Sequence, residues 1–404
     1  MDRVTGDARQ RSPRLLYLGD VPVEASFHGS ALVYRLLQGY SERDLLVIEG
    51  SVGRSLPARR LPGVQYRQLS MGRERWLLTR FRRAVAAGFT LRASARTSQV
   101  ARLLEGFEPE AVLTVAHGFS WLTAAVFAQE RRLPLHLIVH DDLAKVANLP
   151  GPLSTWLDRR FGCVYRQAMS RLCVSPFMVE DFSRRYGVQG EVLYPSRAAD
   201  ALDCDAPPAR ITGAGQPLVF AFGGTINNDE QFRALRLLGE ALDAVAGVLR
   251  VYGPLTRGAA EEAGIMRPNV RLMGVLPSAE FIPTIRAEAD VLFVPMSFMP
   301  EQRAIMTTCF PSKLSDYTAA GLPILIYGPP ECSAVRWAKE NQGSMEVVDV
   351  EGIGCLTESV RRLTESPEYR MELGMQALTV GRQYFSYDAA QRVFRRALGR
   401  GLDV

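Results

Sequence analysis

Short apolar runs alternate with helix-like stretches along the first half of the chain. The runs expected to form strands are residues 14–19, 45–49, 64–69, 111–116, 135–140, 171–175 and 191–195. Helical stretches separate most of them, and such alternation is typical of a parallel sheet covered by helices on both faces. The first half is therefore predicted to be a doubly wound α/β domain.

An irregular stretch interrupts this pattern after residue 196. Residues 197–216 are rich in Ala, Pro, Gly and Asp and have no clear period, which indicates a linker. Beyond it, strands are expected at 217–224, 249–253, 269–276, 289–296 and 323–328, and helices at 228–245, 351–365, 367–384 and 387–399. We therefore predict two Rossmann-like domains facing a cleft, one in residues 1–196 and one beginning at residue 217.

The bulk composition is typical of a soluble globular protein. The chain has 404 residues, enough for two ordinary domains, with 47% hydrophobic and 23% charged residues. No apolar run approaches the roughly 18 residues that a transmembrane helix needs. The polar, basic start has no signal-peptide core, so we expect a cytoplasmic protein whose six cysteines are free thiols.

Positive charge is concentrated in one segment. Residues 51–104 contain twelve arginines and a single acid, Glu74. Apolar residues such as Trp76 and Phe81 lie among the arginines, a pattern typical of a basic amphipathic helix on an anionic membrane surface. We therefore predict contact with the inner face of a membrane through the Arg-rich segment 54–102. The alternative is a helix packed on the sheet with solvated arginines. Nucleic acid is not expected, because the sequence contains no known binding module.

Three of the four histidines follow predicted strands. His28 comes after the first strand, His117 after the 111–116 run, and His140 ends the 135–140 run. Ligands bind beyond the carboxyl ends of strands in doubly wound sheets, so these side chains are expected at one crevice. Each could instead be an ordinary polar residue at a strand end. Asp141 and its acidic neighbour suit a capping or substrate-hydroxyl role better than a metal pair, and no metal site is predicted.

A glycine follows the first strand at the start of a predicted helix. Gly29 and Ser30 open this helix, whose free backbone N–H groups suit an anion. The sequence has no G-x-G-x-x-G and no Walker A pattern, so a dehydrogenase-type or P-loop nucleotide site is not expected.

The stretch FPSKLSDYTAAGLPILIYG, residues 310–328, combines an ammonium and a carboxylate on a short helix. The chain has only three lysines, and Lys313 lies one helical turn from Asp316 on the same face. Pro311 and Ser312 suit the first turn. The helix end and Lys313 could bind phosphates, and Asp316 could bind sugar hydroxyls. The alternative is a surface ion pair between the two. A loop of some fifteen residues precedes the helix.

This stretch resembles the donor-site segment of GT-B glycosyltransferases similar to glycosyltransferase family 4. RLCVSPFMVEDFSRRYG also resembles the family's segment before the interdomain linker, and NVRLMGVLPSAEFIPTIRAEADVLFVP resembles its strand–helix–strand before the donor loop. The resemblance covers nearly the whole chain. It implies a C-terminal nucleotide-sugar domain, residues 217–385, and a last helix, 386–404, that packs on the N-terminal acceptor domain.

The resemblance also implies roles for individual residues. Lys313 would contact the donor diphosphate and Asp316 the ribose, while His117 would lie near the transferred sugar. His117 and Lys313 are thus the expected catalytic residues. The expected donor-binding residues are Gly29, Gly224, Thr225, Asn227, Pro311, Ser312, Lys313 and Asp316. The expected acceptor-side residues are His28, His140 and Asp141.

The sequence departs from the family at two places. Thr308 stands eight residues before Asp316, where the family often has a second glutamate. Because that glutamate usually contacts the donor sugar, the identity of the sugar is not predicted. The segment GGTINNDEQ, 223–231, stands where the family usually has an Arg and a Lys. The phosphates would then depend on Lys313 and on backbone N–H groups.

The expected activity is glycosyl transfer from a nucleotide sugar to a saccharide or lipid-linked envelope acceptor. The resemblance implies retention of anomeric configuration, and no metal or other cofactor is expected. The alternatives are a sugar phosphorylase or nucleotide-sugar epimerase of the same fold, or a non-catalytic binding protein that has lost the acid at Thr308.

Overall fold

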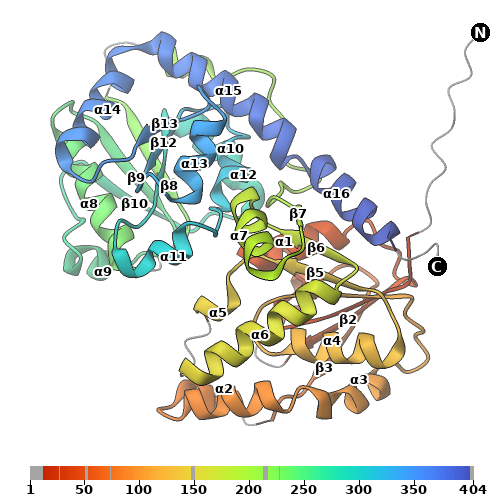
Figure 1. The fold of residues 1–404 in the computed structure, drawn as a ribbon. Helices are drawn as coiled ribbons and strands as arrows, with labels where there is room; N and C mark the ends of the chain where they lie inside the picture. The colour runs from red at the N-terminus through yellow and green to blue at the C-terminus, as the bar shows by residue number, and fades with distance from the viewer. Residues whose placement is uncertain are drawn as a thin grey trace, which may run out of the picture. The chain divides into compact units, whose positions relative to one another are not determined.

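The protein divides into two compact units in the computed structural model (Figure 1). The structure describes residues 12–26, 28–50, 53–72, 74–146, 151–212, 217–226 and 228–400. Unit 1 comprises Met1–Leu193 and Gln391–Val404, and unit 2 comprises Tyr194–Ala390. The predicted linker, 197–216, falls entirely within unit 2. Its role as a linker stays a prediction.

Unit 1 is built on a seven-stranded parallel sheet in the order β3-β2-β1-β4-β5-β6-β7. Its strands are β1 (Leu15–Gly19), β2 (Leu45–Gly50), β3 (Gln65–Leu69), β4 (Ala111–Val115), β5 (Leu135–Val139), β6 (Ser170–Cys173) and β7 (Glu191–Val192). All residues of β1, β2, β4 and β5 are buried, as strands covered on both faces must be.

Helices and short 3₁₀ helices (η) connect these strands. They are α1 (His28–Leu37), η1 (Pro57–Arg59), η2 (Glu74–Leu78), α2 (Arg82–Leu91), η3 (Ser94–Arg96), α3 (Thr97–Leu103), α4 (Ser120–Arg131), α5 (Leu143–Val146), α6 (Gly151–Gln167) and α7 (Pro176–Tyr186). Local signals explain α7 well. The Ser175 side chain accepts a hydrogen bond from Met178 N, Pro176 occupies the first turn, and Gly187 ends the helix with φ +74°.

Unit 2 is built on a six-stranded parallel sheet in the order β10-β9-β8-β11-β12-β13. Its strands are β8 (Val219–Gly223), β9 (Val248–Tyr252), β10 (Val270–Gly274), β11 (Val291–Pro295), β12 (Ile324–Tyr327) and β13 (Glu346–Val348). Its helices are η4 (Ala209–Thr212), α8 (Asp229–Asp243), α9 (Arg257–Glu262), α10 (Ser278–Glu288), η5 (Pro300–Gln302), α11 (Arg303–Met306), α12 (Lys313–Tyr317), α13 (Ser333–Glu340), α14 (Ile353–Glu365) and α15 (Pro367–Phe385). The core includes Phe220, Phe222 and Phe293 from the central strands.

The last helix returns to unit 1. Helix α16 (Tyr387–Gly399) belongs to that unit from Gln391 onward. The Gln391 side chain donates to the Arg35 and Leu36 carbonyls at the end of α1, at 3.1 and 3.0 Å. Arg396 pairs with Glu191 of β7 at 3.0 Å. Unit 1 is therefore made of two separate pieces of the chain.

The predicted fold class, two Rossmann-like α/β domains, is confirmed, and the differences are local. The strand expected at 191–195 pairs only over two residues, and Pro195 has no N–H to extend it. Strand β13 was missed because three residues are too short a run to recognise. No described helix is long and apolar enough to cross a membrane.

Candidate functional site: two clusters at the sheet switch points

The first cluster lies at the end of β8, where the strand order of the unit 2 sheet reverses between β8 and β11. Such switch points are where doubly wound sheets bind ligands. Gly224 follows β8 with φ +125°, a backbone conformation that only glycine adopts without strain. Its carbonyl packs against Gly253 so closely that a Cβ there would lie 2.3 Å from the oxygen. The loops after β8 and β9 thus need glycine to approach each other.

Lys313, the first residue of α12, lies against this glycine. A Cβ on Gly224 would lie 2.9 Å from Lys313 Cε and 3.2 Å from its Nζ. The ammonium lies 5.0 Å from the centre of the Phe222 ring, within range of a cation–π contact. Burial lowers the pKa of Lys313 to about 8.

Helix α12 is anchored to its surroundings by two buried side chains. The Tyr317 hydroxyl accepts a 2.7 Å hydrogen bond from Gly223 N, which ties the helix to the end of β8. Arg197 donates to the Ser315 carbonyl at 3.0 Å and to Thr318 Oγ1 at 3.1 Å. Sequence reasoning missed Arg197, because a lone arginine at the start of a predicted linker gives no signal of burial.

The remaining predicted donor residues surround this helix. Pro311, Ser312 and Asp316 are half-buried at its start and on its first turn, and Thr225 is half-buried beside Gly224. Asn227 lies outside the described residues. Ser312 is the N-cap residue, but its side chain makes no cap hydrogen bond.

The segment before α12 is more ordered than the predicted loop. It contains η5 and α11, and Thr308, at the position of the missing acid, is buried. Its Oγ1 donates to the Ile305 carbonyl at 3.5 Å. A threonine hydroxyl can bond its own helical turn in this way, whereas a carboxylate cannot donate.

We expect anion affinity at this cluster to fall as the pH rises through about 8. Lys313 is charged below its pKa of about 8 and neutral above it, because burial disfavours the charged form. The affinity of wild-type protein for a nucleoside diphosphate, measured by calorimetry between pH 7 and 9.5, should therefore drop. The Lys313→Met variant should bind weakly with a flat profile; a parallel drop in that variant would assign the titration to another group.

The second cluster lies at the switch point of the unit 1 sheet, between β1 and β4. Asp20, directly after β1, accepts hydrogen bonds from Ser120 N and Ser120 Oγ, both at 2.7 Å. A Cβ on Gly118 would lie 2.4 Å from the Asp20 carboxylate, and Gly118 has φ +62°. Asp20 therefore fixes the loop after β4, which carries His117, against the end of β1.

His117, His140 and Asp141 meet beyond the ends of β4 and β5. His140 Nε2 lies 3.3 Å from His117 Nδ1 and 3.5 Å from Asp141 Oδ2. A Cβ on Gly29 would lie 2.8 Å from His140 Cε1, so only glycine allows this approach of α1. Burial lowers the pKa of His140 to about 4; Asp141 opposes this shift and His117 adds to it. His140 is therefore neutral at physiological pH.

The structure brings together most of the residues that were predicted to share the crevice of the histidines. Gly29, His117, His140 and Asp141 are adjacent, while His28 begins α1 and its side chain lies outside the described part. The neighbouring Asp142 is buried in pairs with Lys145 at 2.8 Å and Arg185 at 2.6 Å. The two consecutive acids thus have different partners and do not form a metal pair.

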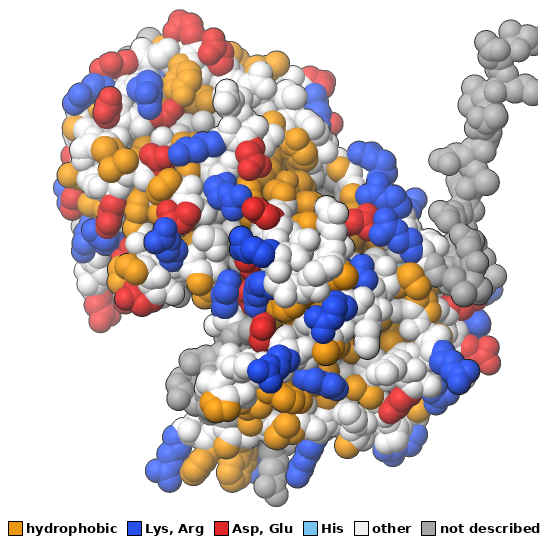
Figure 2. Space-filling view, viewed as in Figure 1, with side chains coloured by type: hydrophobic (Ala, Val, Ile, Leu, Met, Phe, Trp, Pro, Cys, Tyr) orange, Lys and Arg blue, Asp and Glu red, His pale blue; other side chains and the backbone are white. Residues whose placement is uncertain are grey.

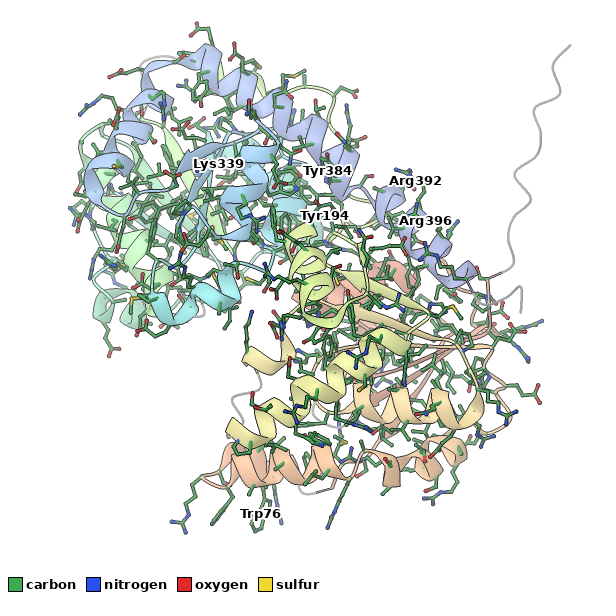
Figure 3. The ribbon with its side chains drawn as sticks, viewed as in Figure 1. Trp76, Tyr194, Lys339, Tyr384, Arg392 and Arg396 are labelled. Atoms are coloured by element: carbon green, nitrogen blue, oxygen red, sulfur yellow. The ribbon has the colours of Figure 1, made fainter. Side chains whose placement is uncertain are left out.

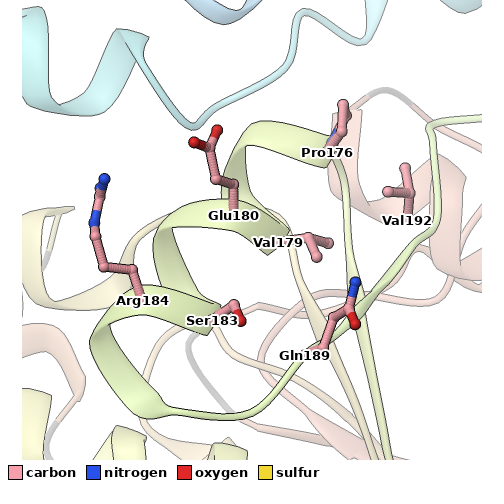
Figure 4. A pocket seen from close by; sticks show the side chains of 7 residues that line it. All are labelled: Pro176, Val179, Glu180, Ser183, Arg184, Gln189 and Val192. Atoms are coloured by element: carbon pink, nitrogen blue, oxygen red, sulfur yellow. The ribbon is translucent and has the colours of Figure 1, made fainter.

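A separate hollow of about 660 Å³ lies along α7 (Figure 4). Its lining residues are Pro176, Val179, Glu180, Ser183, Arg184, Gln189 and Val192. None of them is among the predicted site residues. We therefore assign the candidate chemistry to the two switch-point clusters.

Comparisons with known proteins identify the fold. The sequence matches no protein-family model and no curated protein. The structure is similar to HepE of Anabaena in complex with UDP and glucose, at 12% identity and a TM-score of 0.65, over 96% of this chain and 99% of that one. It is also similar to sucrose-phosphate synthase of Thermosynechococcus elongatus, at 13% identity and a TM-score of 0.65, over 95% and 98%.

A third similar structure is WaaG, a glycosyltransferase involved in lipopolysaccharide biosynthesis. Its identity is 15% and its TM-score 0.61, over 95% of this chain and 99% of that one. These neighbours are GT-B glycosyltransferases, so the chain has the GT-B fold, as the resemblance implied. At such low identity the likeness shows the fold alone.

Proposed function

We propose that the protein is a glycosyltransferase that moves a sugar from a nucleotide-sugar donor to a saccharide or lipid-linked acceptor. The observation that carries this proposal is Lys313, half-buried beside Gly224 at the switch point of the unit 2 sheet. An ammonium next to a glycine backbone that a phosphate can approach closely suits a diphosphate. The neighbours HepE, bound to UDP and to UDP-glucose, make a uridine donor the first to test.

The proposed chemistry is stabilisation of the leaving group. As the bond from the anomeric carbon to the nucleoside diphosphate breaks, negative charge grows on the phosphate, and the Lys313 ammonium offsets it. One preorganised contact of this kind is worth about 3 kcal/mol, or roughly a hundredfold in rate. Asp316 would bind the ribose hydroxyls, and His117 would lie beside the transferred sugar. This step needs no metal at the diphosphate, and we propose retention without a protein nucleophile.

The test is calorimetric titration with UDP, GDP, ADP, TDP and CDP, with and without magnesium. We expect one nucleotide to bind in the micromolar range and Asp316→Ala to weaken it. Donor consumption and the NMR-determined linkage of the product then identify the reaction. An inverted product would contradict retention. Phosphate-dependent turnover would favour a phosphorylase, donor interconversion an epimerase, and binding without turnover a binding protein.

We also propose that the Arg-rich segment 54–102 contacts the inner face of an anionic membrane. The segment is divided among η1, β3, η2, α2, η3 and α3, so the single basic helix of the sequence analysis is not formed. Trp76, Phe81 and Leu91 are nevertheless 38%, 46% and 63% exposed. Figure 3 shows Trp76 pointing away from the unit, and Figure 2 shows basic and hydrophobic side chains together in this region.

Flotation with vesicles tests this contact. Wild-type protein should bind vesicles containing phosphatidylserine and not neutral ones, because each arginine near an anionic surface contributes about 1 kcal/mol. Trp76→Ser combined with Phe81→Ser should reduce flotation. Val275→Ser, at a 59% exposed position in unit 2, is the matched control. Equal flotation on both lipids would end the proposal.

A further inference from the structure

The His117–His140–Asp141 cluster has the composition of a transition-metal site. Two imidazole nitrogens and one carboxylate oxygen, one from each residue, all lie within 4.8 Å of one another. Imidazole with carboxylate is a common ligand set for zinc and similar divalent ions. Magnesium and calcium prefer oxygen ligands, and this cluster offers a single carboxylate.

The spacing of the ligand atoms fits a tetrahedral ion. Zinc bonded to N and O ligands at about 2.0–2.2 Å keeps neighbouring ligand atoms about 3.3–3.6 Å apart. The two separations centred on His140 Nε2 are 3.3 Å to His117 Nδ1 and 3.5 Å to Asp141 Oδ2. A single ion could therefore bridge them without a large rearrangement.

The orientation of His140 leaves one nitrogen for such an ion. Its Nδ1 is buried, has no hydrogen-bond partner among the described residues, and would lie 3.1 Å from a Cβ on Gly29. The ring is therefore held with Nδ1 against α1 and with Nε2 toward His117 and Asp141. His117 is exposed, so an ion could enter from solvent and keep its fourth position open.

We propose that His117, His140 and Asp141 form a binding site for one zinc-like divalent transition-metal ion. The site lies in unit 1 and is independent of the diphosphate step assigned to Lys313. It goes beyond the sequence analysis, which predicted no metal, because a sequence does not show that these three atoms converge. Asp142 is not a ligand, because Lys145 and Arg185 already pair with it.

Zinc chloride alone, titrated into the full-length, metal-free protein against a chromophoric chelator, tests the site. Wild type should bind one equivalent. His140→Gln and Asp141→Asn should each weaken zinc binding at least ~100-fold. Loss of a residue that only hydrogen-bonds a metal ligand lowers metal affinity about 10–100-fold, and loss of a ligand itself should cost more. Glu108→Gln removes a carboxylate that is 81% exposed and should leave zinc affinity unchanged. Magnesium should not compete.

Cobalt(II) provides a second readout that does not depend on transferase activity. The wild-type complex should show the intense visible bands of tetrahedral cobalt, and Asp141→Asn should lose them. Because the described cysteines are free thiols, a near-ultraviolet thiolate band would assign the metal to cysteine and overturn the proposal. Unchanged zinc affinity in both variants, with native circular dichroism, would equally overturn it.

Discussion

Replacing Lys313 by alanine is expected to lower kcat/KM for sugar transfer about a hundredfold or more. Lys313 is half-buried with its ammonium close to Gly224, and removal of one preorganised charge of this kind costs about 3 kcal/mol. Affinity for the nucleoside diphosphate should fall in the same variant, because the product carries the charge that Lys313 binds. Donor consumption under initial-rate conditions and calorimetry measure the two effects.

Lys339→Ala is the matched control for this change. Lys339 is another of the three lysines, half-exposed and paired with Asp349 at 2.6 Å. Exposed ion pairs of this kind contribute about 0–1 kcal/mol, so transfer and nucleotide binding should stay near wild type. If Lys313→Ala behaved like Lys339→Ala in a protein that transfers sugar, the donor phosphates would bind elsewhere.

Gly224→Ala should damage both folding and nucleotide binding. The φ of +125° is strained for any residue with a Cβ, at a cost of about 1–3 kcal/mol. The added methyl would also lie 2.9 Å from Lys313 Cε and displace the ammonium. We expect a lower Tm by thermal denaturation. We also expect a nucleotide affinity at least ~10-fold weaker, because a loss of about 1.4 kcal/mol of binding free energy lowers affinity tenfold.

Gly343→Ala separates the two effects. Gly343 also lies in unit 2 with a positive φ, +76°, but a Cβ there would contact nothing within 4 Å. This control should lose some stability through backbone strain and keep its nucleotide affinity. If Gly224→Ala, tested well below its Tm, bound nucleotide as well as Gly343→Ala, the contact between Gly224 and Lys313 would have no functional consequence.

The sequence predicted the fold well because of how parallel sheets are buried. Strands such as β1 and β4 are covered on both faces and appear as continuous apolar runs between helices. The histidine cluster was also predictable in outline, since β4 and β5 are neighbours and their carboxyl ends share one edge.

Contacts between distant segments could not be predicted in this way. Arg197 reaches Ser315 across 118 positions of the chain, and no local pattern marks such a pair. The 3.3 Å separation of His117 and His140 depends on Gly29 and on the loop that Asp20 fixes. The division of the Arg-rich segment into short helices likewise depends on packing: Arg96, expected in solvent, is buried and donates to the Phe89 carbonyl at 2.6 Å.

The return of α16 to unit 1 has a consequence for the order of folding during synthesis. A ribosome releases residues 1–193 long before residues 391–399, which supply the buried Phe394, Ala397 and Leu398. Domains generally fold as they emerge, so unit 2 can fold while unit 1 still lacks its last helix. Until α16 arrives, the nascent unit 1 exposes the apolar surface that this helix covers and the Arg35 and Leu36 carbonyls bound by Gln391. Truncation before residue 391 would make that exposure permanent and would leave a chain prone to aggregation.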